Sequence, residues 1–173
     1  FPQLWRVERG SGALEPVTTG LGRVTAPSID ATGRMMAFST ATSDRRVVVR
    51  EMDTGSEIEL GGSGDQMFPS LSRDGRILVY SLRAWGRQDL YVQMLDDRGR
   101  PADPPRRLAS HDGTASQPTI SPDSLWVAYV VVSDDNSRHI WTMPMAASST
   151  PRRFSGELAQ NMQPAWSPDG TRL

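Results

Sequence analysis

Three aspartates in matching turn sequences are the residues whose type and spacing could most readily build a metal site. Asp74, Asp123 and Asp169 each follow a serine by two residues, and Gly75 and Gly170 come directly after two of them. Carboxylates repeated at a regular interval can converge on one cation if the fold carries the repeats around a common axis. An aspartate in such a turn also accepts hydrogen bonds from its own backbone amides. We favour this second, structural role, because the first copy of the turn lacks the aspartate at this position, and we predict no metal and no cofactor.

The two histidines, His111 and His139, fall at different phases of the repeat described below. A zinc site needs three or more converging ligands, and the repeat supplies no others, so we expect both histidines at the surface. The chain has no cysteine and no Gly-x-Ser-x-Gly motif for a serine nucleophile. We therefore predict no catalytic residue in this chain, whether it acts alone or as part of a larger enzyme.

Six residues outside the expected core could bind a partner. Trp85 is flanked by Arg83 and Arg87 in a connection between two expected strands, and a large aromatic beside arginines is typical of a binding anchor. The alternative for Trp85 is packing against a neighbouring sheet. The other candidates are glutamines that precede or approach a proline-led strand, where they could bind a ligand or satisfy loop backbone: Gln66, Gln117 and Gln163.

One pattern, seen most completely in residues 68–82, positions all of these residues. It predicts a short strand led by a proline, a tight turn closed by glycine, and a longer strand that is apolar on both faces. The pattern recurs at four leading prolines, which are separated by 42, 49 and 46 residues: Pro27, Pro69, Pro118 and Pro164. Periods in this range are typical of stacked or radial repeats.

Two further strands follow in each repeat, a β-rich third segment and a charged fourth one. Four-stranded antiparallel units of this length are the blades of a β-propeller. We predict an all-β fold with complete blades at about 26–62, 68–110 and 117–156, and half-blades at 3–18 and 163–173, within one partial propeller domain over 1–173. The glutamines would then lie close to the mouth of the central channel. The charged outer strands would protect each sheet edge from pairing with another chain.

Composition excludes several classes of partner. The formal net charge is −1, with 19 basic and 20 acidic residues, which argues against nucleic acid as the main partner. No apolar run approaches the length of about 20 residues that a membrane helix requires. The chain stops soon after a new repeat begins, so we expect a piece of a longer protein, part of a ring of about six blades closed by further blades or by self-association.

The repeated residues resemble a known family. The sequences Ser121-Pro122-Asp123 and Ser167-Pro168-Asp169-Gly170, with the preceding proline and a following strand that ends near Tyr80 or Tyr129, are similar to the PD40, or WD40-like, repeat of TolB-like proteins. The first copy departs from the pattern at 30–33, and the third has Ser124 where glycine is expected. A serine in that left-handed position should cost about 1 kcal/mol.

The resemblance implies a non-catalytic, periplasmic or otherwise extracytoplasmic scaffold that binds a protein or peptide through a propeller face. Two alternatives stay open. Related propellers also form the substrate-gating domain of prolyl-oligopeptidase-like serine peptidases, whose catalytic domain would lie outside this chain, and the ligand-sensing part of some bacterial regulators.

Overall fold

The computed structural model describes residues 3–19, 22–41, 44–146, 149–156 and 160–173. These residues form strands and no helix, and none of them builds a helix that could cross a membrane. The strands are β1 (Trp5–Val7), β2 (Leu14–Pro16), β3 (Arg23–Ile29), β4 (Met35–Ala41), β5 (Arg45–Glu51), β6 (Glu57–Glu59), β7 (Asp65–Leu71), β8 (Ile77–Ala84), β9 (Arg87–Met94), β10 (Arg106–Ala109), β11 (Thr114–Ile120), β12 (Trp126–Val132), β13 (Arg138–Pro144) and β14 (Arg152–Arg153).

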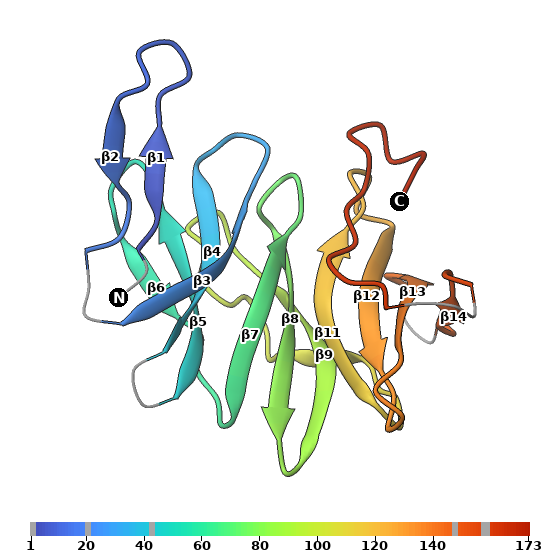
Figure 1. Cartoon of the computed structure of the whole chain (residues 1–173). Helices are drawn as coiled ribbons and strands as arrows, with labels where there is room; N and C mark the ends of the chain where they lie inside the picture. Colours follow the sequence, from blue (N-terminus) through green and yellow to red (C-terminus); the bar gives the residue numbers. More distant parts are fainter. Residues whose placement is uncertain (1–2, 20–21, 42–43, 147–148, 157–159) are drawn as a thin grey trace.

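Three four-stranded antiparallel sheets follow one another along the chain. Their strand orders are β3-β4-β5-β6, β7-β8-β9-β10 and β11-β12-β13-β14, and β1 and β2 form a separate hairpin. Figure 1 shows the sheets side by side as an open fan, with the β1–β2 hairpin at one end and the C-terminal segment at the other. This is the blade architecture of a β-propeller whose ring is not closed, and it confirms the predicted fold class.

In the second and third sheets, one serine hydroxyl holds the turn that joins the first two strands. In the second sheet, the Ser72 hydroxyl donates to Asp74 Oδ1 at 2.5 Å and accepts the Ile77 N–H at 2.9 Å. The Gly75 N–H closes the turn on the Ser72 carbonyl at 3.0 Å, with Gly75 at φ 71°. The serine and the aspartate thus accept hydrogen bonds from backbone N–H groups in the turn between β7 and β8.

The first sheet builds the same turn with an aspartate in place of the serine and a threonine in place of the aspartate. Asp30 occupies the serine position and accepts the Met35 N–H at 3.1 Å, while the Thr32 hydroxyl donates to Asp30 Oδ2 at 2.6 Å. The acceptor for the strand amide is now a carboxylate instead of a hydroxyl. The turn therefore keeps its hydrogen-bond network although its sequence departs from the repeat.

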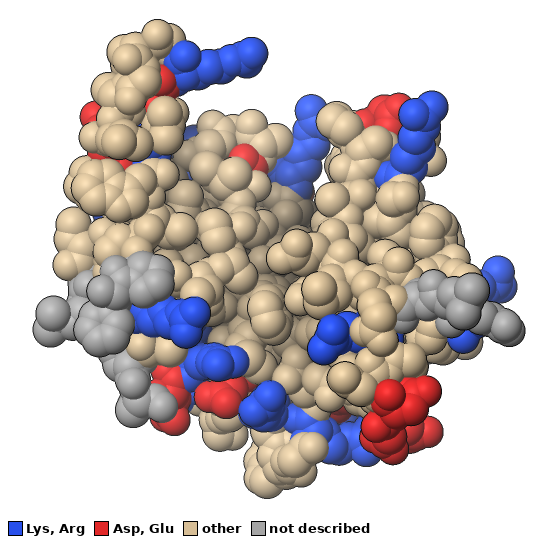
Figure 2. Space-filling view, viewed as in Figure 1, with Lys and Arg blue, Asp and Glu red and all other residues tan. Residues whose placement is uncertain are grey.

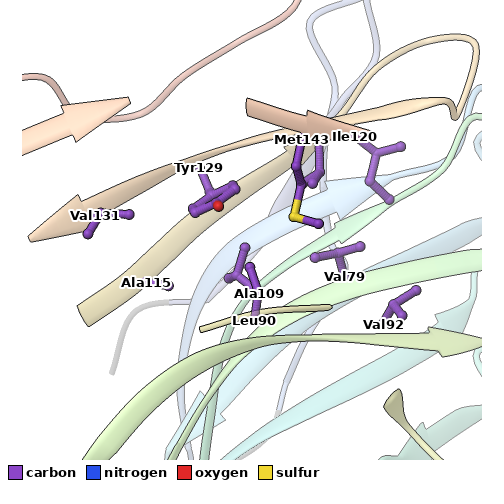
Figure 3. Close-up of a cluster of buried hydrophobic side chains, with 10 residues drawn as sticks. Val79, Leu90, Val92, Ala109, Ala115, Ile120, Tyr129, Val131 and Met143 are labelled. Carbon is purple, nitrogen blue, oxygen red and sulfur yellow. The ribbon is translucent and has the colours of Figure 1, made fainter. Parts of the chain in front are cut away.

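Apolar side chains between neighbouring sheets form the core. One cluster joins the first and second sheets through members that include Val47, Val49, Leu78 and Tyr80. A second cluster joins the second and third sheets, and Figure 3 shows its side chains meeting between the strands: Val79, Leu90, Val92, Ala109, Ala115, Ile120, Tyr129, Val131 and Met143. Strands apolar on both faces are thus covered on both sides.

Hydroxyl groups also link the innermost strands of adjacent sheets. The Leu71 N–H donates to Ser28 Oγ at 2.9 Å, and the Ile120 N–H donates to Ser70 Oγ at 3.2 Å. Ser28 and Ser70 hold the same position in consecutive repeats, directly after the proline. These repeated bonds tie β3 to β7 and β7 to β11.

Candidate functional site: the channel and the rim beside it

A strained backbone position recurs where each innermost strand faces the channel. The residue before each leading proline has a positive φ: Ala26 (53°), Phe68 (52°), Gln117 (51°) and Gln163 (54°). The pairing of each innermost strand with its neighbour shifts register at this point in all three complete sheets. A positive φ at a residue other than glycine costs free energy, so the surrounding sheets must impose this bulge.

The bulges from the four repeats surround a hollow of about 340 Å³. Its lining is uncharged and consists of Thr25, Ala26, Pro27, Phe68, Pro69, Gln117, Pro118, Gln163 and Pro164. The Gln163 N–H donates to Gln117 Oε1 at 2.8 Å, so one of these glutamines already bridges two repeats. The structure brings Gln117 and Gln163 together at the channel, within a wall of prolines and one phenylalanine.

Gln66 lies elsewhere. It is 1% exposed inside β7, and its amide accepts the Val47 N–H at 3.1 Å and donates to the Gly61 carbonyl at 3.0 Å. Its side chain therefore satisfies backbone groups of the preceding sheet and the connecting loop, the alternative raised from the sequence. Gln66 stands three residues before Pro69 and so falls outside the bulge position, directly before the proline, that Gln117 and Gln163 share.

Trp85 projects from the tip of the β8–β9 hairpin. The pairing of Ala84 with Arg87 leaves Trp85 and Gly86 as a two-residue loop, with φ 48° and 77°. Two consecutive left-handed residues are typical of a type I′ turn, which favours asparagine or glycine at its first central position. The tryptophan there is 90% exposed. Packing against a neighbouring sheet, the alternative raised from the sequence, does not occur.

The two arginines beside Trp85 differ in what they contact. Arg87 donates to Ser110 Oγ at 2.9 Å and to the His111 carbonyl at 3.1 Å, so it braces the connection between the second and third sheets. Arg83 is exposed and makes no side-chain hydrogen bond or ion pair within the described part of the chain. Trp85 and Arg83 are therefore the free members of this candidate surface, and Arg87 supports it.

Charged side chains lie along the margins of the side on which the innermost strands β3, β7 and β11 are seen in Figure 1. Figure 2 shows that the middle of this side is free of charged groups, whereas basic and acidic side chains gather along its lower and upper margins. The basic side chains are all arginines, because the chain contains no lysine. The β8–β9 hairpin forms the lowest point of the molecule in Figure 1, at the lower of these margins. The candidate site therefore combines an uncharged channel with a charged rim.

The turn aspartates are engaged in their own turns. Hydrogen bonds from serine hydroxyls and nearby backbone amides lower the pKa of Asp74 and Asp123, and lower that of Asp169 to about 2. Across the described residues, no group of three or more His, Asp or Glu side chains has the geometry to hold a metal ion. These carboxylates therefore stay ionised as turn acceptors.

Both histidines are less exposed than we expected from the sequence. His139 is 9% exposed, and His111 is partly buried. The His111 ring packs edge-on against Trp141 with centroids 4.8 Å apart, and its Nε2 lies 2.9 Å from the Tyr129 hydroxyl. The expectation of surface histidines is therefore wrong, because the loop after β10 packs His111 against Tyr129 and Trp141 of the third sheet, and His139 lies within strand β13 of that sheet. Burial lowers the pKa of His111 and favours the neutral ring.

No protein-family profile matches the sequence, and no curated protein matches it. Solved structures do match. TolB from Acinetobacter baumannii superposes with a TM-score of 0.80 at 18% identity, covering 98% of this chain and 41% of that one. A putative TolB from Agrobacterium tumefaciens gives 0.78 at 18% identity, covering 97% and 62%. The chain has the fold of a TolB-type β-propeller. It spans less than two thirds of the length of either TolB structure.

This chain also superposes on a prolyl endopeptidase structure, with a TM-score of 0.65 at 12% identity, over 87% of this chain and 25% of the endopeptidase. The likeness at these identities concerns the fold. Sequence reasoning found the turns and the hairpin of this propeller, but it missed the left-handed residue before each proline. The signal available was the recurrence of an X-Pro pair at every repeat, which marks an extended or bulged backbone.

Proposed function

We propose that this TolB-type propeller is a non-catalytic scaffold that binds a protein or peptide on the face carrying the β8–β9 hairpin. One observation supports this most directly: a tryptophan stands 90% exposed in a left-handed turn position that suits asparagine or glycine. Exposing so large an apolar ring and straining its backbone both reduce stability. A partner that covers the ring offsets both costs, and buried tryptophans are frequent hot spots of interfaces.

The channel beside this face fits the same role. Its uncharged wall of prolines and Phe68 suits a segment with apolar side chains, and Gln117 offers an amide for backbone contacts. Arg83, which has no partner among the described residues, lies two residues from Trp85 and suits an acidic group at the rim of the interface. We propose that the partner is acidic around an apolar anchor.

The test separates binding from folding. Trp85→Asn places the preferred residue in the turn, so the variant should fold at least as stably as the parent. The protein would be used as bait on envelope extracts of its source cells, and the captured partner would then be titrated against parent and variant. We expect Trp85→Asn to weaken binding at least about 30-fold, which corresponds to a hot spot of 2 kcal/mol.

The control is Trp126→Ala, because Trp126 is a second partly exposed tryptophan at the turn end of the third sheet, far along the strands from the β8–β9 tip. Trp126→Ala should leave the affinity unchanged. Equal affinities for parent and Trp85→Asn would refute the proposed face. The failure of a folded, intact propeller to capture any partner would refute the scaffold itself.

The alternative of a peptidase propeller is supported by the likeness to prolyl endopeptidase. It predicts hydrolysis of proline-containing peptides by the full-length protein that carries this chain, whereas the scaffold predicts none. We also propose an extracytoplasmic location, as the resemblance to TolB implies. A fusion to alkaline phosphatase, which is active only after export, tests that location.

A further inference from the structure

A second hollow lies at the turn end of the innermost strands, and its lining follows that of the first hollow by one or two residues along each strand. Its volume is about 420 Å³, and the ends of β3, β7 and β11 and the segment 165–168 surround it. Most of its wall is apolar, with Leu71 and Ile120 from two strands and Trp166 from the C-terminal segment. Trp166 is held in place because its indole N–H donates to the Thr119 carbonyl at 3.1 Å.

Arg73 is the one charged residue in the lining of this hollow. It occupies the second position of its turn, where the other repeats have Ala31, Pro122 and Pro168. Proline is the favoured residue at this position because its fixed φ suits the turn. The fold therefore does not require an arginine here, and its presence needs another explanation.

The guanidinium of Arg73 has no partner within the described part of the chain. The neighbouring Arg76, by contrast, forms an ion pair with Asp97, and Arg34 reaches Glu51 at 3.7 Å. The closest carboxylate in sequence, Asp74, accepts from Ser72 and from the Arg76 N–H. Arg73 thus presents free donors at the mouth of an apolar hollow.

Thr119 adds a second free donor to the same wall. Ser28 and Ser70 occupy the equivalent position in the earlier repeats, and both accept a strand amide from the next sheet. No hydrogen bond of the Thr119 hydroxyl occurs within the described ranges. One guanidinium and one hydroxyl, both without a hydrogen-bond partner among the described residues, thus line one hollow with apolar walls.

We propose that this hollow binds a carboxylate attached to an apolar group, with the carboxylate on Arg73 and Thr119 and the apolar group against Leu71, Ile120 and Trp166. One carboxylate, with a single charge and two acceptor oxygens, matches one guanidinium. The carboxylate belongs either to a small organic acid or to the C-terminus of a peptide. This site lies at the turn end of the strands, away from the β8–β9 hairpin tip that carries Trp85.

The experiment is an NMR titration of the isotope-labelled chain with N-acetyl-L-phenylalanine. The matched control ligand is N-acetyl-L-phenylalaninamide, which keeps the apolar group and lacks the charge. We expect the acid to shift the Trp166 indole and Arg73 side-chain signals saturably and the amide to bind at least about tenfold more weakly, the worth of one charged hydrogen bond. Equal binding of acid and amide would overturn the proposal.

Variants then test whether the Arg73 guanidinium binds the carboxylate. Arg73→Gln should weaken the binding of the acid at least about tenfold. Arg73→Pro should weaken it equally and keep the turn intact, because two other repeats carry proline at this position. Arg76→Gln, which removes a neighbouring exposed arginine, should change nothing. Unchanged affinity in both Arg73 variants would overturn the proposal. If the site is confirmed, the tripeptide Ala-Ala-Phe identifies the source of the carboxylate. A peptide C-terminus is indicated if Ala-Ala-Phe binds more tightly than both its C-terminal amide and N-acetyl-L-phenylalanine. A small organic acid is indicated if Ala-Ala-Phe and N-acetyl-L-phenylalanine bind equally.

Discussion

Ser124 is the residue that departs from its repeat at a measurable cost. It lies at φ 60° in the turn position where Gly33, Gly75 and Gly170 have φ between 71° and 74°. Its Cβ makes this conformation unfavourable, while glycine adopts it freely. We predict that Ser124→Gly raises the free energy of unfolding by about 0.5–1 kcal/mol.

Chemical denaturation of the two proteins under one condition measures this difference. Gly75→Ala provides the converse, since it places a Cβ in the same turn position of the second sheet and should lower the stability by about 1 kcal/mol. If Ser124→Gly proved destabilising, the Ser124 side chain would have to make a contact that outweighs its backbone strain.

His111 should make the stability depend on pH near neutrality. Burial lowers its pKa below the ordinary value, against the smaller opposing effects of Asp89 and Asp112. The unfolded chain then binds more protons than the folded one as the pH falls through about 6.5, so stability rises with pH in this window and is lost on acidification. The turn carboxylates, whose pKa values are lowered, lose their contribution only below about pH 4.

The measurement is the free energy of unfolding at pH 7.5, 6.5 and 5.5. We predict a decrease toward pH 5.5 in the parent and a flatter profile in His111→Gln, which removes the titrating ring. A parent profile that stays flat over this range would contradict the effect of burial on His111.

At the scale of the strands and their connections, close backbone approach limits what the loops tolerate. Gly113 lies just before β11, where an added Cβ would stand 2.1 Å from the Val132 carbonyl oxygen at the end of β12. Backbone cannot move aside as a flexible side chain can. We predict that Gly113→Ala lowers the free energy of unfolding by about 2–3 kcal/mol.

Gly61→Ala is the matched control, because nothing lies within 4 Å of a Cβ at Gly61, in a loop of the same kind. Its effect should stay within about 0.5 kcal/mol. Thermal melts of the two variants in parallel test the pair, and comparable losses from both would mean that general loop entropy, not the contact with Val132, dominates.

The strands themselves were readable from the sequence because their physics is local. The turn serine, the aspartate and the glycine act within a few residues of one another, and the nearly continuous apolar run of β8 can be read without knowledge of its neighbours. The candidate site was less readable. The burial of Gln66 depends on Val47 in another sheet, and the exposure of Trp85 depends on the length of a hairpin. Both are set by contacts between segments that the local pattern does not specify.

At the scale of the whole molecule, each sheet is stabilised by its neighbours. Leu78 and Leu90 both belong to the second sheet and are both 0% exposed, but Leu78 packs toward the first sheet and Leu90 toward the third. Replacing either by alanine should cost about 2–5 kcal/mol. The stability of a repeat array is approximately the sum of the stabilities of its units and of the interfaces between them. Leu78→Ala should therefore destabilise mainly the first sheet, and Leu90→Ala mainly the third.

Hydrogen exchange of the backbone amides resolves where each loss falls. We predict that Leu78→Ala lowers protection mainly in β3–β6, which then lose their packing on the second sheet, whereas Leu90→Ala lowers protection mainly in β11–β14. The two variants serve as controls for each other, since they remove the same side chain from one sheet. A uniform loss of protection in both variants would contradict this prediction. It would show that the sheets unfold as one cooperative unit and that the interfaces between them do not contribute independently to stability.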